Sequence, residues 1–218
     1  MRIIYLNCWY AKTGRVFFDF VKENSLNTDI FCFQEVSPAL FSELGEILFR
    51  HCGFSATGDK AIFVKNCLKI APVGKSDVSF LQVLRIKIKK KELFLGNVHG
   101  KARPGHKLDT PARLRQSRKI IKLFLRYKGP KIIGGDFNLS PETKSIRIFE
   151  ERGYWNLVKD FGVKSTRNRL VWDDLKKGEE KQYFADYVFV SPEVKVGSFS
   201  VPDIEISDHL PLILDFEV

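Results

Sequence analysis

Acidic, amide and imidazole side chains stand at the ends of six short apolar runs in this sequence. In chain order they are Asn7, Glu35, His99, Asp136 with Asn138, Asp186, and Asp208 with His209. Carboxylate and amide oxygens suit hard cations such as Mg²⁺ or Mn²⁺, and an imidazole titrates near neutral pH, where it exchanges protons readily. This set of residue types indicates metal-dependent hydrolysis of a phosphoester.

The apolar runs themselves are typical of buried β-strands. The polar residue follows the run in segments 3–6, 30–33, 93–95 and 132–133, and it precedes the run in segments 187–190 and 210–214. If the last two strands run antiparallel to the first four, all the polar ends meet at one rim. Taken singly, an Asp or Asn after a strand is usually a turn former or a helix cap, but the repeated pattern favours a site.

Two glycines, Gly134 and Gly135, come directly before Asp136. A residue without a side chain lets the backbone approach another group closely. We therefore expect Asp136 and Asn138 to present one carboxylate and one amide near a phosphate.

Six motifs in the order of the chain resemble those of the endonuclease/exonuclease/phosphatase superfamily, which includes deoxyribonuclease I, exonuclease III type abasic endonucleases, inositol-polyphosphate phosphatases and neutral sphingomyelinases. They are Leu6-Asn7, Phe33-Gln34-Glu35, Asn97-Val98-His99, Gly135-Asp136-Phe137-Asn138, Ala185-Asp186-Tyr187-Val188-Phe189 and Ser207-Asp208-His209-Leu210-Pro211. The resemblance implies an α/β fold, a four-layer sandwich in which two mainly antiparallel β-sheets pack face to face and are flanked by helices.

The metal site is expected around Glu35, because a carboxylate suits Mg²⁺ or Mn²⁺. Asn7 is expected to help hold metal or phosphate, and Asp208 adds negative charge nearby. A surface carboxylate that merely follows a strand is the alternative for Glu35.

The resemblance also implies the catalytic roles. His209 activates water or stabilises the pentacovalent phosphate with Asp186 as its partner, Asp136 orients water or relays a proton, Asn138 contacts phosphate or the nucleophile, and His99 donates to a phosphoryl oxygen. Whether Asp136 or His209 is the general base stays open. His99 and His209 have purely structural roles as their alternatives.

Length and composition favour one catalytic domain over residues 1–218. With 44% hydrophobic residues and no linker or repeat, the chain can bury one large core. Helices are expected to begin at Ser37-Pro38, Thr110-Pro111 and Ser140-Pro141, where a capping residue precedes a proline, and to end by Gly53, Gly129 and Gly153. A fourth, over 15–23, would also suit a strand.

The net charge of +10 is concentrated in one segment. Residues 85–131 carry a net charge of +14, whereas the rest of the chain carries −4. Such a segment suits a polyanion such as nucleic acid, although 87–91 would equally form a solvated hairpin turn and 113–128 the wet face of a helix. We predict that Lys101, Arg103 and Lys107, in the loop directly after His99, bind substrate.

Segment 165–168 resembles the variable Ser/Thr segment that precedes the Asp-Tyr motif in many family members. There the hydroxyl of Thr166 would support the site and Arg167 would bind phosphate. Polar residues of this kind also form ordinary loops.

The four cysteines lack zinc spacing, and the sequence shows neither a signal peptide nor a membrane span. We therefore expect free thiols in a monomeric, cytoplasmic protein.

The substrate is predicted by charge and by exclusion. A divalent-metal-dependent nuclease acting on DNA or RNA is the first prediction, and a phosphatase or phosphodiesterase for a small or lipid-linked phosphate is the second. Exonuclease III type enzymes have Val-Ala where this chain has Leu139-Ser140, and Trp-Arg where it has Tyr183-Phe184. A binding module without catalysis is the third reading, and the intact set of site residues argues against it.

Overall fold

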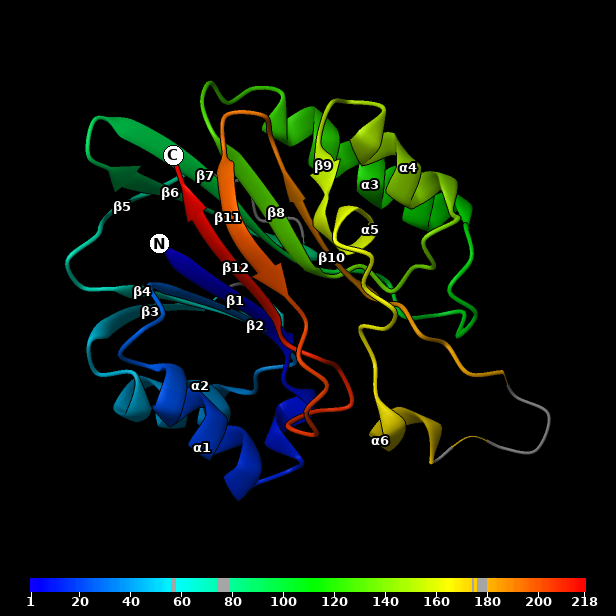
Figure 1. The fold of residues 1–218 in the computed structure, drawn as a ribbon, viewed down its shortest axis with the longest axis horizontal. Helices are drawn as coiled ribbons and strands as arrows, with labels where there is room; N and C mark the ends of the chain where they lie inside the picture. Colours follow the sequence, from blue (N-terminus) through cyan, green and yellow to red (C-terminus); the bar gives the residue numbers. More distant parts are fainter. Residues whose placement is uncertain (56–57, 74–78, 174, 176–179) are drawn as a thin grey trace.

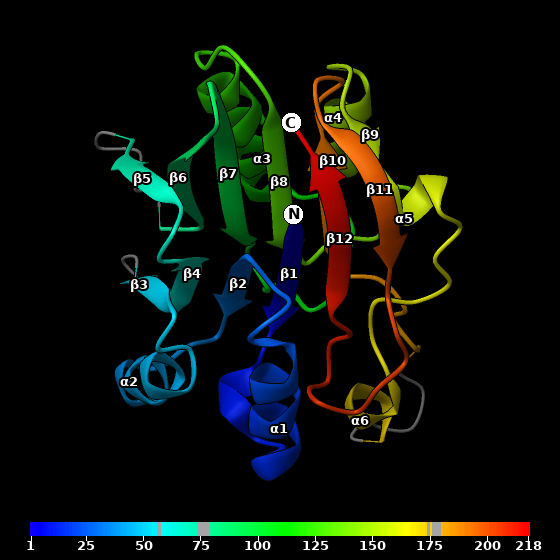
Figure 2. The same cartoon turned by 60° about the vertical axis from the view of Figure 1, so that its left-hand side comes forward.

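The computed structural model describes residues 1–55, 58–73, 79–173, 175 and 180–218, and two β-sheets lie at its centre (Figure 1). The strand orders are β11-β12-β1-β2-β4-β3 and β5-β6-β7-β8-β10-β9. Helices α1 and α2 cover the outer face of the first sheet, and α3 and α4 cover the second (Figures 1 and 2). The predicted two-sheet sandwich with flanking helices is confirmed.

The first sheet contains strands from both ends of the chain. Its strands are β1 (Arg2–Asn7), β2 (Ile30–Gln34), β3 (His51–Ser55), β4 (Lys60–Lys65), β11 (Lys195–Ser200) and β12 (Leu212–Glu217). Strands β1 and β2 are parallel, and β12 runs antiparallel to β1. The last strand therefore has the predicted direction, although it begins at Leu212 instead of residue 210.

The second sheet is built from the middle of the chain. Its strands are β5 (Lys69–Pro72), β6 (Leu81–Ile88), β7 (Lys91–His99), β8 (Lys131–Asp136), β9 (Trp155–Asn156) and β10 (Asp186–Val190). Strands β7 and β8 are parallel, and β10 runs antiparallel to β8. All six polar strand ends consequently meet at one rim, as the sequence pattern predicts.

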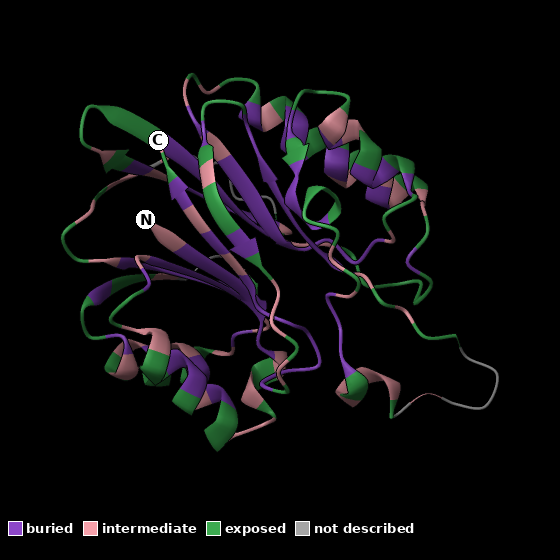
Figure 3. Ribbon diagram, viewed as in Figure 1, coloured by how far each residue is buried: buried purple, intermediate pink, exposed green. Residues whose placement is uncertain are grey.

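Strands β1, β2 and β10 read as continuous apolar runs because they are buried on both faces (Figure 3). In β1, Ile3 and Tyr5 belong to the core cluster that includes both sheets, whereas Ile4 and Leu6 pack into a second cluster with α1 and α2. Alternate residues of a strand point to opposite faces. Both faces of β1 therefore need apolar side chains.

The helices are α1 (Arg15–Asn24), α2 (Pro38–Ile47), α3 (Pro111–Phe124), α4 (Lys144–Glu150), α5 (Leu157–Asp160) and α6 (Arg169–Trp172), with a 3-10 turn η1 (Trp9–Ala11). The starts of α2 and α3 are as predicted, since Ser37 and Thr110 accept hydrogen bonds from the backbone amides of Leu40 and Arg113. Segment 15–24 is a helix and not a strand.

The third predicted helix begins later than the sequence suggested. Helix α4 starts at Lys144, and Ser140-Pro141 opens only a turn before it. The carboxylate of Asp109 accepts hydrogen bonds from the amides of Lys144 and Ser145 at 2.7 and 3.0 Å. The prediction was wrong because a side chain more than thirty residues away in sequence satisfies the first amides of this helix.

The cysteines Cys8 and Cys32 are buried free thiols, and Cys52 and Cys67 are exposed free thiols. Among the described residues, no helix has the length and apolar character needed to cross a bilayer.

Candidate active site

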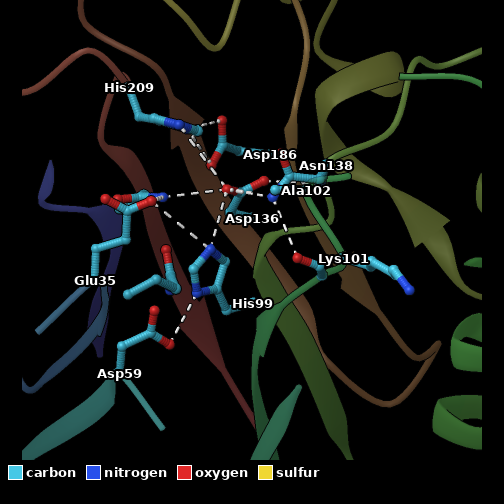
Figure 4. A network of polar contacts seen from close by, with 12 residues as sticks. Glu35, Asp59, His99, Lys101, Ala102, Asp136, Asn138, Asp186 and His209 are labelled. Carbon is cyan, nitrogen blue, oxygen red and sulfur yellow. Dashed lines mark hydrogen bonds and ion pairs between the residues drawn. The ribbon is translucent and has the colours of Figure 1, made fainter. Parts of the chain in front are cut away.

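Strand register brings the polar ends together across both sheets (Figure 4). Asp136 at the end of β8 lies opposite His99 of β7 on one side and Asp186 of β10 on the other. From the other sheet, the Asn7 amide nitrogen donates to Glu35 Oε1 and to Asp136 Oδ2, both at 3.1 Å. These five predicted residues therefore form one cluster.

Asp136 lies at the centre of this cluster. Its carboxylate accepts hydrogen bonds from the backbone and the side chain of Asn138 at 2.8 and 2.9 Å, and its Oδ2 lies 3.8 Å from His99 Nε2 and 3.9 Å from His209 Nε2. Burial alone would raise the pKa of Asp136, but the positive charges of His209, Lys107 and His99 outweigh burial and lower it. Asp136 is therefore an ionised carboxylate at neutral pH.

His209 is held by Asp186 in a buried pair. Its Nδ1 lies 3.0 and 2.9 Å from the two Asp186 oxygens, so Nδ1 carries a proton and donates it to that carboxylate. Burial favours the neutral ring, but the charges of Asp186 and Asp136 outweigh this and raise the pKa of His209 above its usual value. The ring is thus oriented with Nε2 toward Asp136.

His99 has a partner that no sequence motif indicated. Its Nδ1 donates to Asp59 Oδ1 at 2.9 Å, which directs Nε2 toward Asp136 and Glu35. Burial by itself would lower the pKa of His99, but the hydrogen bond to Asp59 and the nearby carboxylates raise it. Asp59 lies before β4 in a Gly-Asp-Lys sequence without chemical signature, so only the tertiary structure identifies it.

Glu35 has a positive φ angle, which is unusual for a residue other than glycine. Its φ is 58°, and the neighbouring η1 residues Trp9, Tyr10 and Ala11 have φ of 48°, 52° and 56°. Each such non-glycine residue costs about 1 kcal/mol or more. Hydrogen bonds from the Trp9 amide to Asn7 Oδ1 and from the Tyr10 amide to the Glu35 carbonyl hold this turn against the cluster.

Two further predicted residues form an ion pair at the edge of the cluster. Arg167 Nη2 donates to Asp208 Oδ2 at 2.8 Å, and both side chains are largely buried. The Nε of Arg167 is buried and has no hydrogen-bond partner within the part of the chain that the structure describes. An unpartnered buried donor is costly, so the Nε–H of Arg167 is available to donate to a further acceptor.

Thr166 has no exposed surface, and its hydroxyl accepts hydrogen bonds from the backbone amides of Ala185 and Asp186 at 3.0 and 3.2 Å. It therefore supports the start of β10, the strand that begins with Asp186. A contact between Thr166 and substrate stays a prediction.

The predicted basic residues of the loop after His99 differ in burial. Lys107 is buried, and its ammonium group donates to Asn138 Oδ1. Burial lowers the pKa of Lys107, and Arg167 adds to that effect. Lys101 and Arg103 are exposed, and Figure 4 shows the Lys101 side chain directed away from the carboxylates.

The sequence did not single out Arg113, which organises that loop. The side chain is 1% exposed, and its guanidinium donates to the backbone carbonyls of Lys101, Ala102, Pro104, His106 and Leu108. The reading of 113–128 as a wet helix face is therefore wrong for Arg113, because the loop carbonyls need a buried donor. Arg115, Arg118, Lys119 and Lys122 are exposed as that reading expects.

The hairpin reading of 87–91 is confirmed. Ile88 pairs with Lys91 next to the exposed turn between β6 and β7. His99 is at the other end of β7, about 26 Å away at the rise of a strand. These lysines therefore lie far from the cluster.

Buried amides tie the two sheets together directly beneath the site. Gln34 Nε2 donates to Asn97 Oδ1 at 2.6 Å, and Asn97 Nδ2 donates to the Phe33 carbonyl at 3.0 Å. Both side chains are fully buried. Gln34 and Asn97 belong to the recognised motifs, and the structure shows that they hold the scaffold.

The two glycines before Asp136 serve packing within the protein. A Cβ on Gly134 would lie 2.7 Å from the Tyr5 ring, and one on Gly135, whose φ is +123°, would lie 2.3 Å from the Val98 carbonyl oxygen. The close approach that the sequence predicted is therefore made to the neighbouring strand and the opposite sheet.

The donor set fits a divalent cation. One amide nitrogen bridges Glu35 and Asp136 oxygens, so two carboxylates converge on one point. In addition, Asp136, Asp186 and His209 each offer one ligand atom, and these atoms lie within 4.8 Å of one another. Oxygen-rich clusters of this kind suit Mg²⁺ or Mn²⁺.

Comparison with known proteins agrees with this geometry. The model of the Endonuclease/Exonuclease/phosphatase family matches residues 5–209. No curated protein matches the sequence.

Solved structures similar to this fold share little sequence with it. An endonuclease/exonuclease/phosphatase family protein from Bacteroides thetaiotaomicron is 18% identical, with a TM-score of 0.76 over 99% of this chain and 97% of that one. A mannosyl-6-phosphatase from the same organism is 18% identical, with a TM-score of 0.73 over 100% of both chains. TDP2 of D. rerio complexed with a single-strand DNA product is 15% identical, with a TM-score of 0.76 over 100% of this chain and 99% of that one.

Matched strand ends, a buried carboxylate and imidazole cluster, and a family model that spans most of the sequence agree. The chain belongs to the Endonuclease/Exonuclease/phosphatase family.

Proposed function

We propose that this phosphoester hydrolase is a divalent-metal-dependent nuclease that cleaves phosphodiester bonds in DNA or RNA. The observation that carries the proposal is the placement of Asp136 between His99 and His209, where His99 also lines a groove with exposed basic residues of the 100–119 segment. The first feature provides hydrolytic chemistry. The second provides electrostatic attraction for a polymer of phosphates.

In this proposal Glu35 is the principal metal ligand, with Asn7 and Asp208 contributing. A bound Mg²⁺ or Mn²⁺ supplies positive charge to the phosphoryl oxygens and to the leaving oxygen. Release of Asp208 from Arg167 would free its carboxylate, and the same movement would let Arg167 reach a phosphate.

The remaining residues bind the phosphate and handle protons. Asp136 is ionised and accepts hydrogen bonds, so it orients water or takes its proton, and His209 Nε2 faces the same point. His99 Nε2 donates to a phosphoryl oxygen as negative charge develops. The Asn138 amide nitrogen donates to Asp136 and to the Gly100 carbonyl, and from this position the side chain contacts the phosphate or the nucleophile. Lys107 and Arg167 add positive charge from the other side.

A phosphatase or phosphodiesterase for a small or lipid-linked phosphate is the second candidate. A cavity of about 820 Å³ beside Lys107 and Arg167 is lined by Trp172, Tyr183 and Phe184, among others. Its volume is that of a typical small-molecule site. The aromatic rings would equally stack on a base or a sugar.

The test is cleavage of an end-labelled DNA duplex with one abasic site, in Mg²⁺ or Mn²⁺, with an EDTA control and the His209→Ala variant. We expect metal-dependent cutting that the variant loses. Product lengths separate incision at the abasic site from end resection and random nicking. An intact duplex, followed by intact single-stranded RNA, would transfer the assignment to the small-phosphate alternative.

Salt dependence separates the two candidates independently. A protein that neutralises several phosphates of a polymer loses affinity steeply as salt rises, whereas a single phosphate responds mildly. The proposal also includes a cytoplasmic monomer, and analytical ultracentrifugation tests its oligomeric state.

A further inference from the structure

A basic groove of about 450 Å³ lies beside the site, between the start of β6 and helix α3. Its lining includes Phe80, His99, Lys101, Arg115, Gln116 and Lys119. His99 belongs to both the groove and the catalytic cluster, where its Nε2 lies 3.8 Å from Asp136 Oδ2. The groove is therefore a direct continuation of the site.

The groove carries positive charge without a compensating partner in the described residues. Lys101, Arg115 and Lys119 are exposed, and no lining residue is acidic. None of the three forms an ion pair with any other described residue. Their charges are therefore directed at solvent or at a ligand.

The basic side chains are placed by rigid elements. Arg115 and Lys119 lie four residues apart on α3, which puts them on one face about 6 Å apart along the helix axis. The Gln116 side-chain oxygen accepts a hydrogen bond from the Lys101 amide at 3.2 Å. The Arg113 guanidinium donates a hydrogen bond to the Lys101 carbonyl at 3.1 Å. The loop therefore holds Lys101 against the same face of α3.

We propose that this groove binds the sugar-phosphate backbone of a nucleic-acid strand next to the scissile phosphate, so that the strand passes His99 and runs along α3. The inference rests on the proposed nuclease function and specifies the path that the substrate strand takes away from the site. A row of exposed cations suits successive phosphates of one strand. A single small phosphate bound at Asp136 would not extend into this groove.

Helix α3 offers a matched control for the test. Arg118 and Lys122 are exposed, have the same spacing as Arg115 and Lys119, and do not line the groove. We therefore compare R115Q/K119Q with R118Q/K122Q, because each double variant removes two charges from the same helix. Circular dichroism and thermal unfolding verify that both are folded.

Binding is measured in the His209→Ala background, so that the probe survives, by fluorescence anisotropy of a labelled single-stranded oligonucleotide across a series of salt concentrations. We expect R115Q/K119Q to weaken binding about tenfold or more and to flatten the dependence of log affinity on log salt by roughly 1 to 2. The R118Q/K122Q pair should change affinity less than about threefold, by long-range charge alone. Equal losses of affinity in both double variants, or no loss in R115Q/K119Q, would overturn the proposal that this groove binds nucleic acid.

Catalysis is measured with His209 restored, on the oligonucleotide and on bis(p-nitrophenyl) phosphate. R115Q/K119Q should raise the KM for the polymer more than the KM for the small diester. If the unmutated protein cleaves neither substrate while the two double variants still differ in binding, the nuclease assignment fails and the proposal that the groove binds nucleic acid is supported. If it cleaves both and the two pairs bind alike, the groove fails and the nuclease assignment stands.

Discussion

Two histidines approach Asp136 from opposite sides with the same geometry and different exposure. His209 donates from Nδ1 to Asp186 and His99 donates from Nδ1 to Asp59, each at 2.9 Å, and their Nε2 atoms lie 3.9 and 3.8 Å from Asp136 Oδ2. The His209 and Asp186 side chains are 5% and 1% exposed, whereas those of His99 and Asp59 are 15% and 31% exposed. Burial, and not the pairing, distinguishes the two sides.

This difference in burial predicts that the two His–Asp pairs have different roles. In a buried environment charges interact strongly and an unpaired charge is costly, so the His209 side is fixed in one protonation pattern and orientation. Water screens the His99 side, which also opens onto the basic groove. We infer that the buried side controls the chemical step, while the open side adjusts to metal, substrate and pH.

The largest expected effect is that of Asp186→Asn on the buried side. The amide cannot hold Nδ1–H in the same way, so His209 loses its tautomer and its orientation. We expect kcat to fall by about 10² to 10⁴ with unchanged circular dichroism. A loss of less than tenfold would show that the two sides do not differ as proposed.

Glu35→Gln should act mainly through the metal. Removing one carboxylate charge weakens cation binding, so we expect the Mg²⁺ concentration for half-maximal activity to rise by at least about tenfold. A metal titration of activity measures this. Glu23→Gln, an exposed carboxylate on α1, is the control, and an unchanged Mg²⁺ requirement in Glu35→Gln would assign the metal to other ligands.

Asp59→Asn tests the open side and should have a smaller effect. Burial lowers the pKa of His99, and the hydrogen bond that its Nδ1 donates to Asp59 is the largest contribution that raises it. The variant should therefore lower the pKa of His99 and reduce kcat by about tenfold, less than Asp186→Asn. A histidine NMR titration follows the pKa. A rise in pKa, or a loss of kcat as large as that of Asp186→Asn, would contradict the comparison.

His51 provides the smallest effect and a reference outside the site. Burial lowers its pKa, and its ring contacts the Thr28 carbonyl at 2.9 Å instead of a carboxylate. At pH 6.5 folded His51 stays neutral because its pKa is lowered, while the same histidine in the unfolded chain takes up a proton as the pH falls below its ordinary pKa of 6.5. The free energy of unfolding should therefore fall as pH falls from 6.5 to the lower pKa of the folded state, by at most about 1.4 kcal/mol per pH unit.

His51→Gln should flatten this pH dependence without changing kcat. Urea unfolding between pH 5 and about 7 measures the slope, and the same samples are assayed for activity. A slope that persists in the variant would assign the titration to other groups.

Much of the site was predictable because its chemistry lies in short segments. A polar residue at the end of a strand can be read from the short apolar run that it follows or precedes, and this is how Asn7, Glu35, Asp136 and Asp186 were predicted. The starts of α2 and α3 were predicted for the same reason. A capping residue and a proline are neighbours in the chain.

Partners that lie outside the six motifs and far away in the sequence were not predictable. Asp59 is forty residues from His99, and Arg113 satisfies carbonyls of a loop that carries no corresponding pattern. The sequence grouped Lys107 with Lys101 and Arg103 as substrate-binding residues, yet only Lys107 of the three is buried, and it donates to Asn138. Such contacts depend on how elements pack, and hydrogen-bond satisfaction is decided there.

The sequence by itself determined the six strands that carry a polar residue at one end, because each is a run of a few adjacent residues, and the order of six short motifs along the chain indicated the family. Tertiary structure alone decided which histidine is more deeply buried, that Asp59 partners His99, and which cations face the groove. Burial and charge pairing are properties of three-dimensional neighbours, and they set the pKa values and the openness that separate the two sides of Asp136.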